Sequence, residues 1–235
     1  LATTNPPWRV AQQWGDLLLA CLLASGPAAR AANFTTGTDS AAKLRVHEVV
    51  LHGDGSVANP FDTVATVTFV PASGEKNAKT VRAFFDGDNT WRARVYVSDA
   101  GEWTWTSACP SNKRLDGQRG KFAARDSGLR GRLLPHPKNP RQWTTEDGRW
   151  FLNLNDTAYF LLCAHDGNGA PVSDADAQQY VRADVERGIT SIRCFLASRR
   201  GGFTESNEQW RAWHFADDTL DRLRLDNLRR ADRRL

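Results

Sequence analysis

Apolar and polar positions alternate through the first half of the chain. Between Lys43 and Phe122, apolar side chains recur at every second position in several short runs, and glycine, proline and Asp-Gly steps separate the runs. The segment TVRAFFDGDNTWRARVYVS (80–98) holds two such runs around DGDN, which is a hairpin signal. No window of this region has a helical period. The pattern predicts an antiparallel β-sandwich over residues 43–128.

Three tryptophans fall within these predicted strands. Trp91, Trp103 and Trp105 would suit an aromatic platform for sugar rings, or they would fill the interior between two sheets. Large aromatic side chains dominate sandwich cores, which favours the interior for Trp91 and Trp105.

The period changes after a linker. Residues 129–149 contain three prolines and a short hairpin that turns at Glu146–Gly148. A strand at 151–155 (FLNLN) follows, then an amphipathic helix capped by Ser173 and ended by Gly188, and then a second strand from Ile189. Strand, helix and strand in this order begin a doubly wound sheet or a (β/α)8 barrel, and no GxGxxG supports dinucleotide binding. Residues 150–235 are therefore expected to hold the first βα units of one of these two architectures.

Polar side chains occur where these strands end. Asn155 and Asp156 end the first strand, and Arg193 lies at or near the end of the second. Because the carboxyl ends of parallel strands share one edge, we expect Asp156 and Arg193 to be neighbours at the mouth of a site. The alternative for Asp156 is a cap on the segment that follows it.

Composition narrows the function classes. The net charge is +4, and 40% of residues are hydrophobic, as in ordinary globular proteins. Positive residues are scattered except for a cluster near the C-terminus, and no groove-binding motif is present, so no nucleic-acid partner is predicted. The spacing of Cys109, Cys163 and Cys194 matches no zinc site. Two alternatives remain for these cysteines, namely buried thiols or a contact between Cys163 and Cys194. No metal and no organic cofactor are predicted.

The first 32 residues contain the three regions of a secretory signal peptide in the usual order. Arg9 precedes an apolar run at 17–24, and small residues follow at 26–32. The run is too short to span a bilayer, which needs about 20 residues. Secreted or periplasmic location is therefore expected, with an outer-surface lipoprotein as the alternative, because LLAC at Cys21 resembles a lipoprotein box. The chain starts without methionine and ends within a leucine pattern of helical spacing, which is typical of a fragment.

Two segments of the second half resemble a known family. DGRWFLNLNDTAYFLL (147–162) is similar to the opening of apiosidase-like glycoside hydrolases, and residues 176–197 resemble their next helix and strand. Residues 91–122 resemble the β-sandwich of unknown function that precedes such barrels. Asn155 stands where the family usually has glycine, and Tyr159 where it often has tryptophan.

The resemblance implies a (β/α)8 glycosidase acting on polysaccharide or oligosaccharide through two carboxylates. Residues 150–235 would then form the first βα units of an incomplete TIM-type barrel that follows the β-sandwich. Those carboxylates are expected on later strands, beyond the C-terminus of this chain, so no catalytic residue is assigned and Glu205 and Glu208 receive no role. The resemblance implies a set of substrate-binding side chains in the cleft: Asn155, Asp156, Arg193, Trp210, Trp213 and His214. Arg193 would also orient a later carboxylate, and packing against the barrel rim is the alternative for Trp210, Trp213 and His214. Two other functions stay open, namely a carbohydrate-binding sandwich module and a catalytically inactive fragment.

Overall fold

A computed structural model describes residues 34–36, 40–159, 161–162, 172–194 and 222–235. All of them lie in the compact unit Ala31–Leu235. The first nine strands are β1 (Phe34–Thr36), β2 (Ser40–Ala42), β3 (Val46–His52), β4 (Thr66–Val70), β5 (Lys79–Arg82), β6 (Phe84–Phe85), β7 (Thr90–Tyr96), β8 (Gly101–Ala108) and β9 (Arg119–Arg125). The remaining elements are β10 (Leu133–His136), β11 (Asn139–Thr145), β12 (Trp150–Phe151), β13 (Asn155–Thr157), β14 (Ser191–Arg193), α1 (Asp174–Glu186), α3 (Leu225–Arg234) and two short 3₁₀ turns, η1 (Pro60–Asp62) and η2 (Glu75–Asn77).

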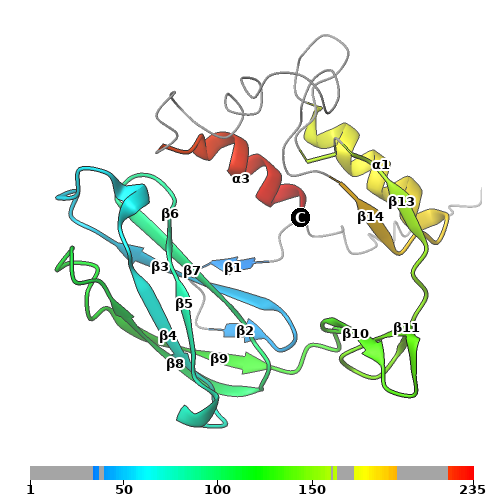
Figure 1. The fold of residues 1–235 in the computed structure, drawn as a ribbon, viewed down its shortest axis with the longest axis horizontal. Coiled ribbons are helices and arrows are strands. Elements are labelled where there is room, and N and C mark those ends of the chain that lie inside the picture. Colours follow the sequence, from blue (N-terminus) through cyan, green and yellow to red (C-terminus); the bar gives the residue numbers. More distant parts are fainter. Residues whose placement is uncertain (1–33, 37–39, 160, 163–171, 195–221) are drawn as a thin grey trace, which may run out of the picture. The chain divides into compact units, whose positions relative to one another are not determined.

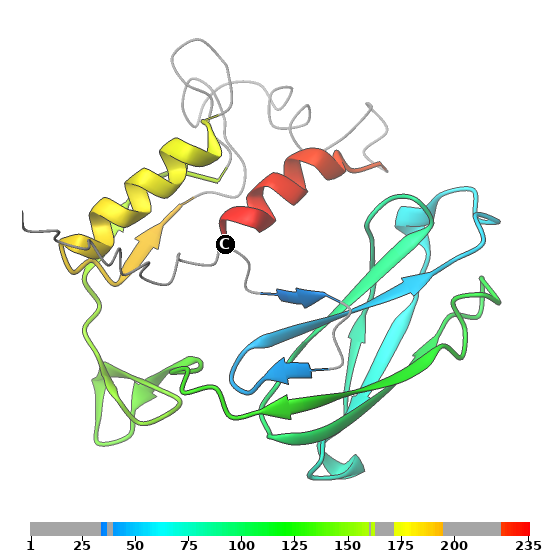
Figure 2. The ribbon, with the colours of Figure 1, turned by 180° about the vertical axis from the view of Figure 1, so that it is seen from behind.

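The first nine strands form two sheets that face each other (Figure 1; Figure 2). One sheet has the order β1-β3-β7-β6, and the other has the order β2-β9-β8-β4-β5. The strands from β3 to β9 pair antiparallel within their sheets, whereas β1 joins β3 and β2 joins β9 in parallel. This arrangement agrees with the sandwich that the alternating pattern predicts.

The core of the sandwich is built from the inward positions of both sheets. Trp91 and Val95 of β7 meet Phe69 of β4, Trp103 of β8 and Phe122 of β9 in one buried cluster. Trp91 and Trp103 have no exposed surface, and the Trp103 and Phe122 rings stack at 5.7 Å between centroids. Trp105 is partly buried against the same cluster. The interior reading of the tryptophans is confirmed, because burial removes their rings from solvent.

The DGDN segment forms the predicted hairpin turn between β6 and β7. Gly87, Asp88 and Asn89 all have positive φ angles of 81°, 47° and 54°. Glycine, aspartate and asparagine tolerate this left-handed region better than other residues. The turn places Phe85 opposite Trp91 in the antiparallel pair.

Residues 133–151 form a separate sheet of three strands, β10-β11-β12. Trp143 pairs with Phe151 and Thr144 pairs with Trp150, so the hairpin predicted around Glu146–Gly148 is confirmed. The Glu146 carboxylate accepts hydrogen bonds from Arg132 and from the Tyr96 hydroxyl of β7, which ties the hairpin to the sandwich.

The segment from Asn155 to Arg193 is a strand–helix–strand unit. β13 and β14 pair in parallel, as predicted, and α1 lies between them in the chain. Ser173 caps α1, since its hydroxyl accepts a hydrogen bond from the Asp176 N–H at 3.1 Å. Gly188 follows the helix with a φ of 79°, which is a common way for a helix to end.

The expectation of a TIM-type barrel start is wrong. The described residues contain two α-helices, α1 and α3, and most of the remaining structure is β-strand in several sheets. β13 and β14 form a two-stranded sheet of three-residue strands, without the repeated helix–strand alternation of a barrel. A single βαβ unit and the opening of a barrel have the same hydrophobic pattern, so the pattern could not separate them. The fold is a β-rich one.

Several expectations fall outside the described residues. They are the leader at 1–32 with Cys21, the possible partner Cys163, and the loop at 195–221. Within the described part, Cys109 is a buried free thiol and Cys194 is a half-buried one. None of the described helices has the length and apolar character needed to cross a bilayer.

Candidate functional site

The two parallel strands carry a polar face. Asn155 is opposite Ser191, and Thr157 is opposite Arg193. Cross-strand neighbours share one side of a sheet, so these four side chains lie on the same side. The Ser191 hydroxyl also donates to the Asn153 side-chain oxygen at 2.8 Å, which adds an amide to this side. We call this set of side chains the strand-pair face: Asn153, Asn155, Thr157, Ser191 and Arg193.

An aromatic ring adjoins the strand-pair face. The Arg193 guanidinium lies over the Tyr159 ring, 5.5 Å from its centroid, in cation–π geometry. Arg193 is exposed, and 40% of the Tyr159 surface is exposed. A planar cation and an aromatic ring are therefore both accessible to a ligand.

Asp156 lies on the opposite side of the strand pair. Its register partner is Ile192, one residue before Arg193. The Asp156 carboxylate accepts hydrogen bonds from the Tyr180 hydroxyl of α1 and from the Thr157 N–H, the latter at 2.7 Å. These two bonds lower the pKa of Asp156, and the same contact raises the pKa of Tyr180 to about 12.

The structure thus brings Asp156 and Arg193 to neighbouring positions but points them to different sides. Asn155 shares the side of Arg193, so it is the amide and not the carboxylate that accompanies the guanidinium. The other predicted site residues, Trp210, Trp213 and His214, and the unassigned Glu205 and Glu208, lie outside the described residues.

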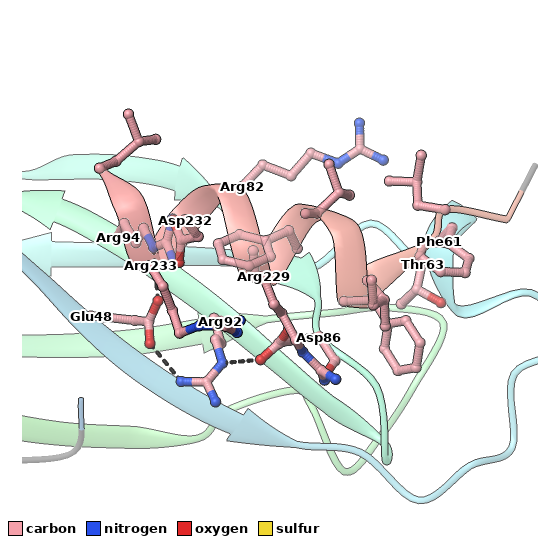
Figure 3. A pocket seen from close by; sticks show the side chains of 17 residues that line it. Glu48, Phe61, Thr63, Arg82, Asp86, Arg92, Arg94, Arg229, Asp232 and Arg233 are labelled. Carbon is pink, nitrogen blue, oxygen red and sulfur yellow. Dashed lines mark hydrogen bonds and ion pairs between the residues drawn. The ribbon is translucent and has the colours of Figure 1, made fainter. Parts of the chain in front are cut away.

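A second polar site lies on the outer side of the β3–β7 pair. Glu48 accepts hydrogen bonds from Arg92 at 2.6 Å and from Arg94 at 2.7 Å. Asp86 accepts from Arg92 and, at 2.8 Å, from Arg229 of α3. Figure 3 shows Glu48, Arg92 and Asp86 in a row beneath the helix. We call the connected set the ionic network: Glu48, Asp86, Arg92, Arg94, Arg229 and Asp232.

The ionic network is partly withdrawn from water. Only 3% of the Glu48 side chain is exposed, and a carboxylate at such a position is stable only with charged or hydrogen-bonding partners. Burial by itself lowers the pKa values of Arg92 and Arg94, but their bonds to carboxylates outweigh it and raise both values. Arg92 and Arg94 are therefore ionised at neutral pH.

Part of the ionic network could have been predicted from the sequence. Arg92 and Arg94 alternate with the buried Trp91, Ala93 and Val95, so their outward orientation follows from the strand period. Asp232, the partner of Arg94, is 138 residues further along the chain, and no local pattern connects the two.

A cavity of about 900 Å³ lies between this side of the sandwich and α3. Phe61, Phe84 and Phe85 line it from the sandwich, and Leu225 and Leu228 line it from the helix. The cavity therefore combines apolar walls with the arginines of the ionic network. No group of three or more metal-ligating side chains occurs in the part of the chain that the structure describes.

Part of the sandwich matches a known protein family. Residues 40–110 match the family described as "Domain of unknown function (DUF5060)". No curated protein matches the chain.

Comparison with solved structures identifies a protein with a similar fold. A protein described as a "putative glycoside hydrolase" from Bacteroides vulgatus superposes with a TM-score of 0.63 at 20% identity, over 84% of this chain and 38% of its own. This chain therefore spans well under half the length of that protein, and the likeness shows a shared fold. A filamin domain of Lin-41 covers 39% of this chain at 14% identity with a TM-score of 0.29, and Amebosin covers 40% at 14% identity with a TM-score of 0.21.

Proposed function

We propose that this chain is a carbohydrate-recognising part of a glycoside hydrolase that acts on polysaccharide or oligosaccharide. The strand-pair face is the observation that carries the proposal, because it places amide, hydroxyl and guanidinium groups beside an accessible aromatic ring. The fold shared with a putative glycoside hydrolase supports it, and so does the resemblance of residues 147–162 to apiosidase-like enzymes.

The chemistry of the strand-pair face suits a sugar. Sugar hydroxyls both donate and accept hydrogen bonds, and Asn155 and Thr157 offer both kinds of group, whereas Arg193 donates only. The apolar side of a sugar ring packs against aromatic rings, and Tyr159 presents such a ring at the end of the strand. A mixture of polar groups around one aromatic side chain gives orientation and contact area together.

The sandwich by itself is a weaker candidate for sugar recognition. Trp91 and Trp103 are completely buried and Trp105 is half-buried, so these three rings form no platform at the surface.

Affinity electrophoresis of the full chain tests the proposal. The protein is run through native gels that contain xylan, pectin, β-glucan or arabinogalactan, and retardation measures binding. We expect retardation on at least one neutral glycan, weakened about tenfold in affinity by Arg193→Ala and by Tyr159→Ala. Arg182→Ala on the exposed side of α1 is the matched control and should bind like the unchanged chain. Absence of retardation on every glycan, or equal loss in the control, would overturn the proposal.

We also propose that residues 1–32 direct export from the cell. The basic residue, apolar run and small residues of this segment support the proposal. Expression of residues 1–235 fused to a periplasm-dependent reporter, with and without residues 1–32, tests it. Equal reporter activity in the two strains would refute export.

A further inference from the structure

We propose that the cavity between the sandwich and α3 binds a carboxylated saccharide, that is, a uronate. The saccharide part of this inference rests on the proposed function, whereas the acidic part rests on the charges of the cavity. This site is separate from the strand-pair face and uses different residues.

The side chains around the cavity carry a surplus of positive charge. Five arginines and three carboxylates line it: Arg82, Arg92, Arg94, Arg229, Arg233, Glu48, Asp86 and Asp232. The ionic network joins three of the arginines to the three carboxylates, so their charges compensate one another. Arg82 and Arg233 are the surplus.

These two arginines are available to a ligand. The Arg82 guanidinium on β5 forms no ion pair with any residue that the structure describes, and Arg82 is exposed. Arg233 has one ion pair within the same residues, with Asp174 at 3.8 Å, which is beyond hydrogen-bond range. A guanidinium presents a planar fork of N–H donors that matches the two oxygens of a carboxylate. The cavity therefore offers free donors of the shape that an anionic group needs.

The apolar walls indicate what the anionic group is attached to. Phe61 and Phe85 meet edge to face at 5.2 Å, and Phe84 is 40% exposed with the Arg94 guanidinium 4.8 Å from its ring centroid. Leu225 and Leu228 face them from α3. Such walls contact the C–H side of a ring, which an inorganic anion lacks.

The size of the cavity also favours an organic ligand over a simple ion. About 900 Å³ lies in the upper part of the range of roughly 300–1,000 Å³ typical of organic ligands. A simple ion would leave most of this space unfilled, whereas an oligosaccharide of a few rings would occupy it. Positive charge within a partly enclosed space also concentrates anionic ligands.

Calorimetric titration of the full chain tests the inference. The probes are trigalacturonate, its carboxyl-reduced counterpart galactotriose, a 6-sulfated galactotriose and sodium sulfate. We expect trigalacturonate to bind at least tenfold more tightly than galactotriose. Its affinity should fall at least tenfold in Arg82→Ala and in Arg233→Ala, and should decrease as salt is raised from 50 to 500 mM, since salt screens exposed charges.

Arg119→Ala is the matched control, because Arg119 is an exposed arginine on β9 that does not line the cavity. It removes the same charge and should leave the affinity for trigalacturonate unchanged. Equal weakening in Arg82→Ala and Arg119→Ala, or equal binding of trigalacturonate and galactotriose, would overturn the inference. Tighter binding of the sulfated sugar than of trigalacturonate would reassign the ligand class and so overturn the uronate assignment.

A further variant separates this inference from the proposed function. Arg193→Ala alters the strand-pair face alone and should retain binding of trigalacturonate. If Arg193→Ala abolishes that binding while Arg82→Ala keeps it, uronates bind at the strand-pair face and the cavity inference fails alone. If trigalacturonate binds in the cavity but no neutral glycan retards the chain, the proposed function of the strand-pair face fails alone.

Discussion

Arg94 on β7 and Asp232 on α3 form a bidentate ion pair, with N–O distances of 2.8 and 2.6 Å, across 138 residues of sequence. Two parallel N–H to oxygen bonds are the strongest geometry that an arginine and a carboxylate can adopt. The pair, together with the Arg229–Asp86 bond, attaches α3 to the sandwich. At the other side of the helix, Arg234 donates to the Asp174 carboxylate at 2.9 Å and to the Leu161 carbonyl at 2.9 Å.

Asp232→Asn should loosen α3 from the sandwich. The substitution removes one of the two carboxylates that Arg94 binds, the other being Glu48, and we expect a loss of about 1–3 kcal/mol of stability, as for a charged group that loses a partner. Hydrogen exchange of the α3 amides, measured by mass spectrometry, should accelerate. Asp226→Asn is the control, because the Asp226 side chain is 94% exposed on the same helix. Unchanged exchange in Asp232→Asn would show that the apolar contacts of the helix hold it without the ion pair.

Glu48→Gln should destabilise the sandwich itself. The substitution leaves Arg92 and Arg94 without the buried carboxylate that both of them bind, and we expect a cost of at least about 2 kcal/mol. Chemical denaturation measures it as a lower midpoint. Glu102→Gln should cost less than about 1 kcal/mol, since Glu102 and its partner Lys121 are 60% and 70% exposed. Similar midpoints for the two variants would contradict the structural role of Glu48.

The stability of the hairpin attachment should depend on pH through Glu146. The Arg132 hydrogen bond, followed by that of Tyr96, lowers the Glu146 pKa from 4.5 to about 2. A lowered pKa in the folded state stabilises the protein above pH 4.5, and this contribution disappears as the pH falls from 4.5 towards 2. Glu146→Gln should therefore lower the Tm at pH 7, and the difference from the unchanged protein should shrink towards pH 2.

The matched control for this titration is Glu75→Gln. Glu75 is exposed and forms no ion pair with a described residue, so its replacement removes the same charge without removing an ion pair and should lower the Tm at pH 7 less than Glu146→Gln does. A Tm difference for Glu146→Gln that stays constant across this range would contradict the ionised contact with Arg132.

Tyr180→Phe should raise the pKa of Asp156 towards that of an ordinary aspartate. The Tyr180 hydroxyl is the main cause of the lowered value, and phenylalanine keeps the ring while removing the donor. Carbon-13 NMR of the labelled Asp156 carboxyl group, followed against pH, measures the change. The remaining Thr157 N–H bond should keep part of the lowering. An unchanged titration midpoint would show that Tyr180 does not donate to this carboxylate in solution.

The sequence predicted local structure well where one residue type decides it. The period of two between Lys43 and Phe122, the DGDN turn and the Ser173 cap follow from short-range rules. The parallel pairing of 155–157 with 191–193 follows from the order strand, helix, strand. The sequence-based prediction of a repeated barrel was wrong. The hydrophobic pattern of a single strand–helix–strand unit is the same as that of the first unit of an eight-unit barrel.

The candidate site was predicted only in part, for geometrical reasons. The strand ends at Asp156 and Arg193 are adjacent, but the register sets Asp156 against Ile192 and so turns the two side chains to different sides. A shift of one residue in register reverses the side on which every side chain lies, and sequence alone does not fix it for strands of three residues. The ionic network was missed because Asp232 and Arg94 meet only through tertiary packing.

The two short strands that precede the sandwich determine where an expression boundary can be set. β1 and β2 pair with β3 and β9 over three residues each and so cover the outer edge of both sheets. A recombinant version that starts at Lys43 would lack both strands and leave Val46–Glu48 of β3 and Ala123–Arg125 of β9 with unpaired backbone groups. Uncovered strand edges recruit strands from other molecules. Starting upstream of Phe34 should therefore yield monomeric material, whereas the shorter version should self-associate during purification.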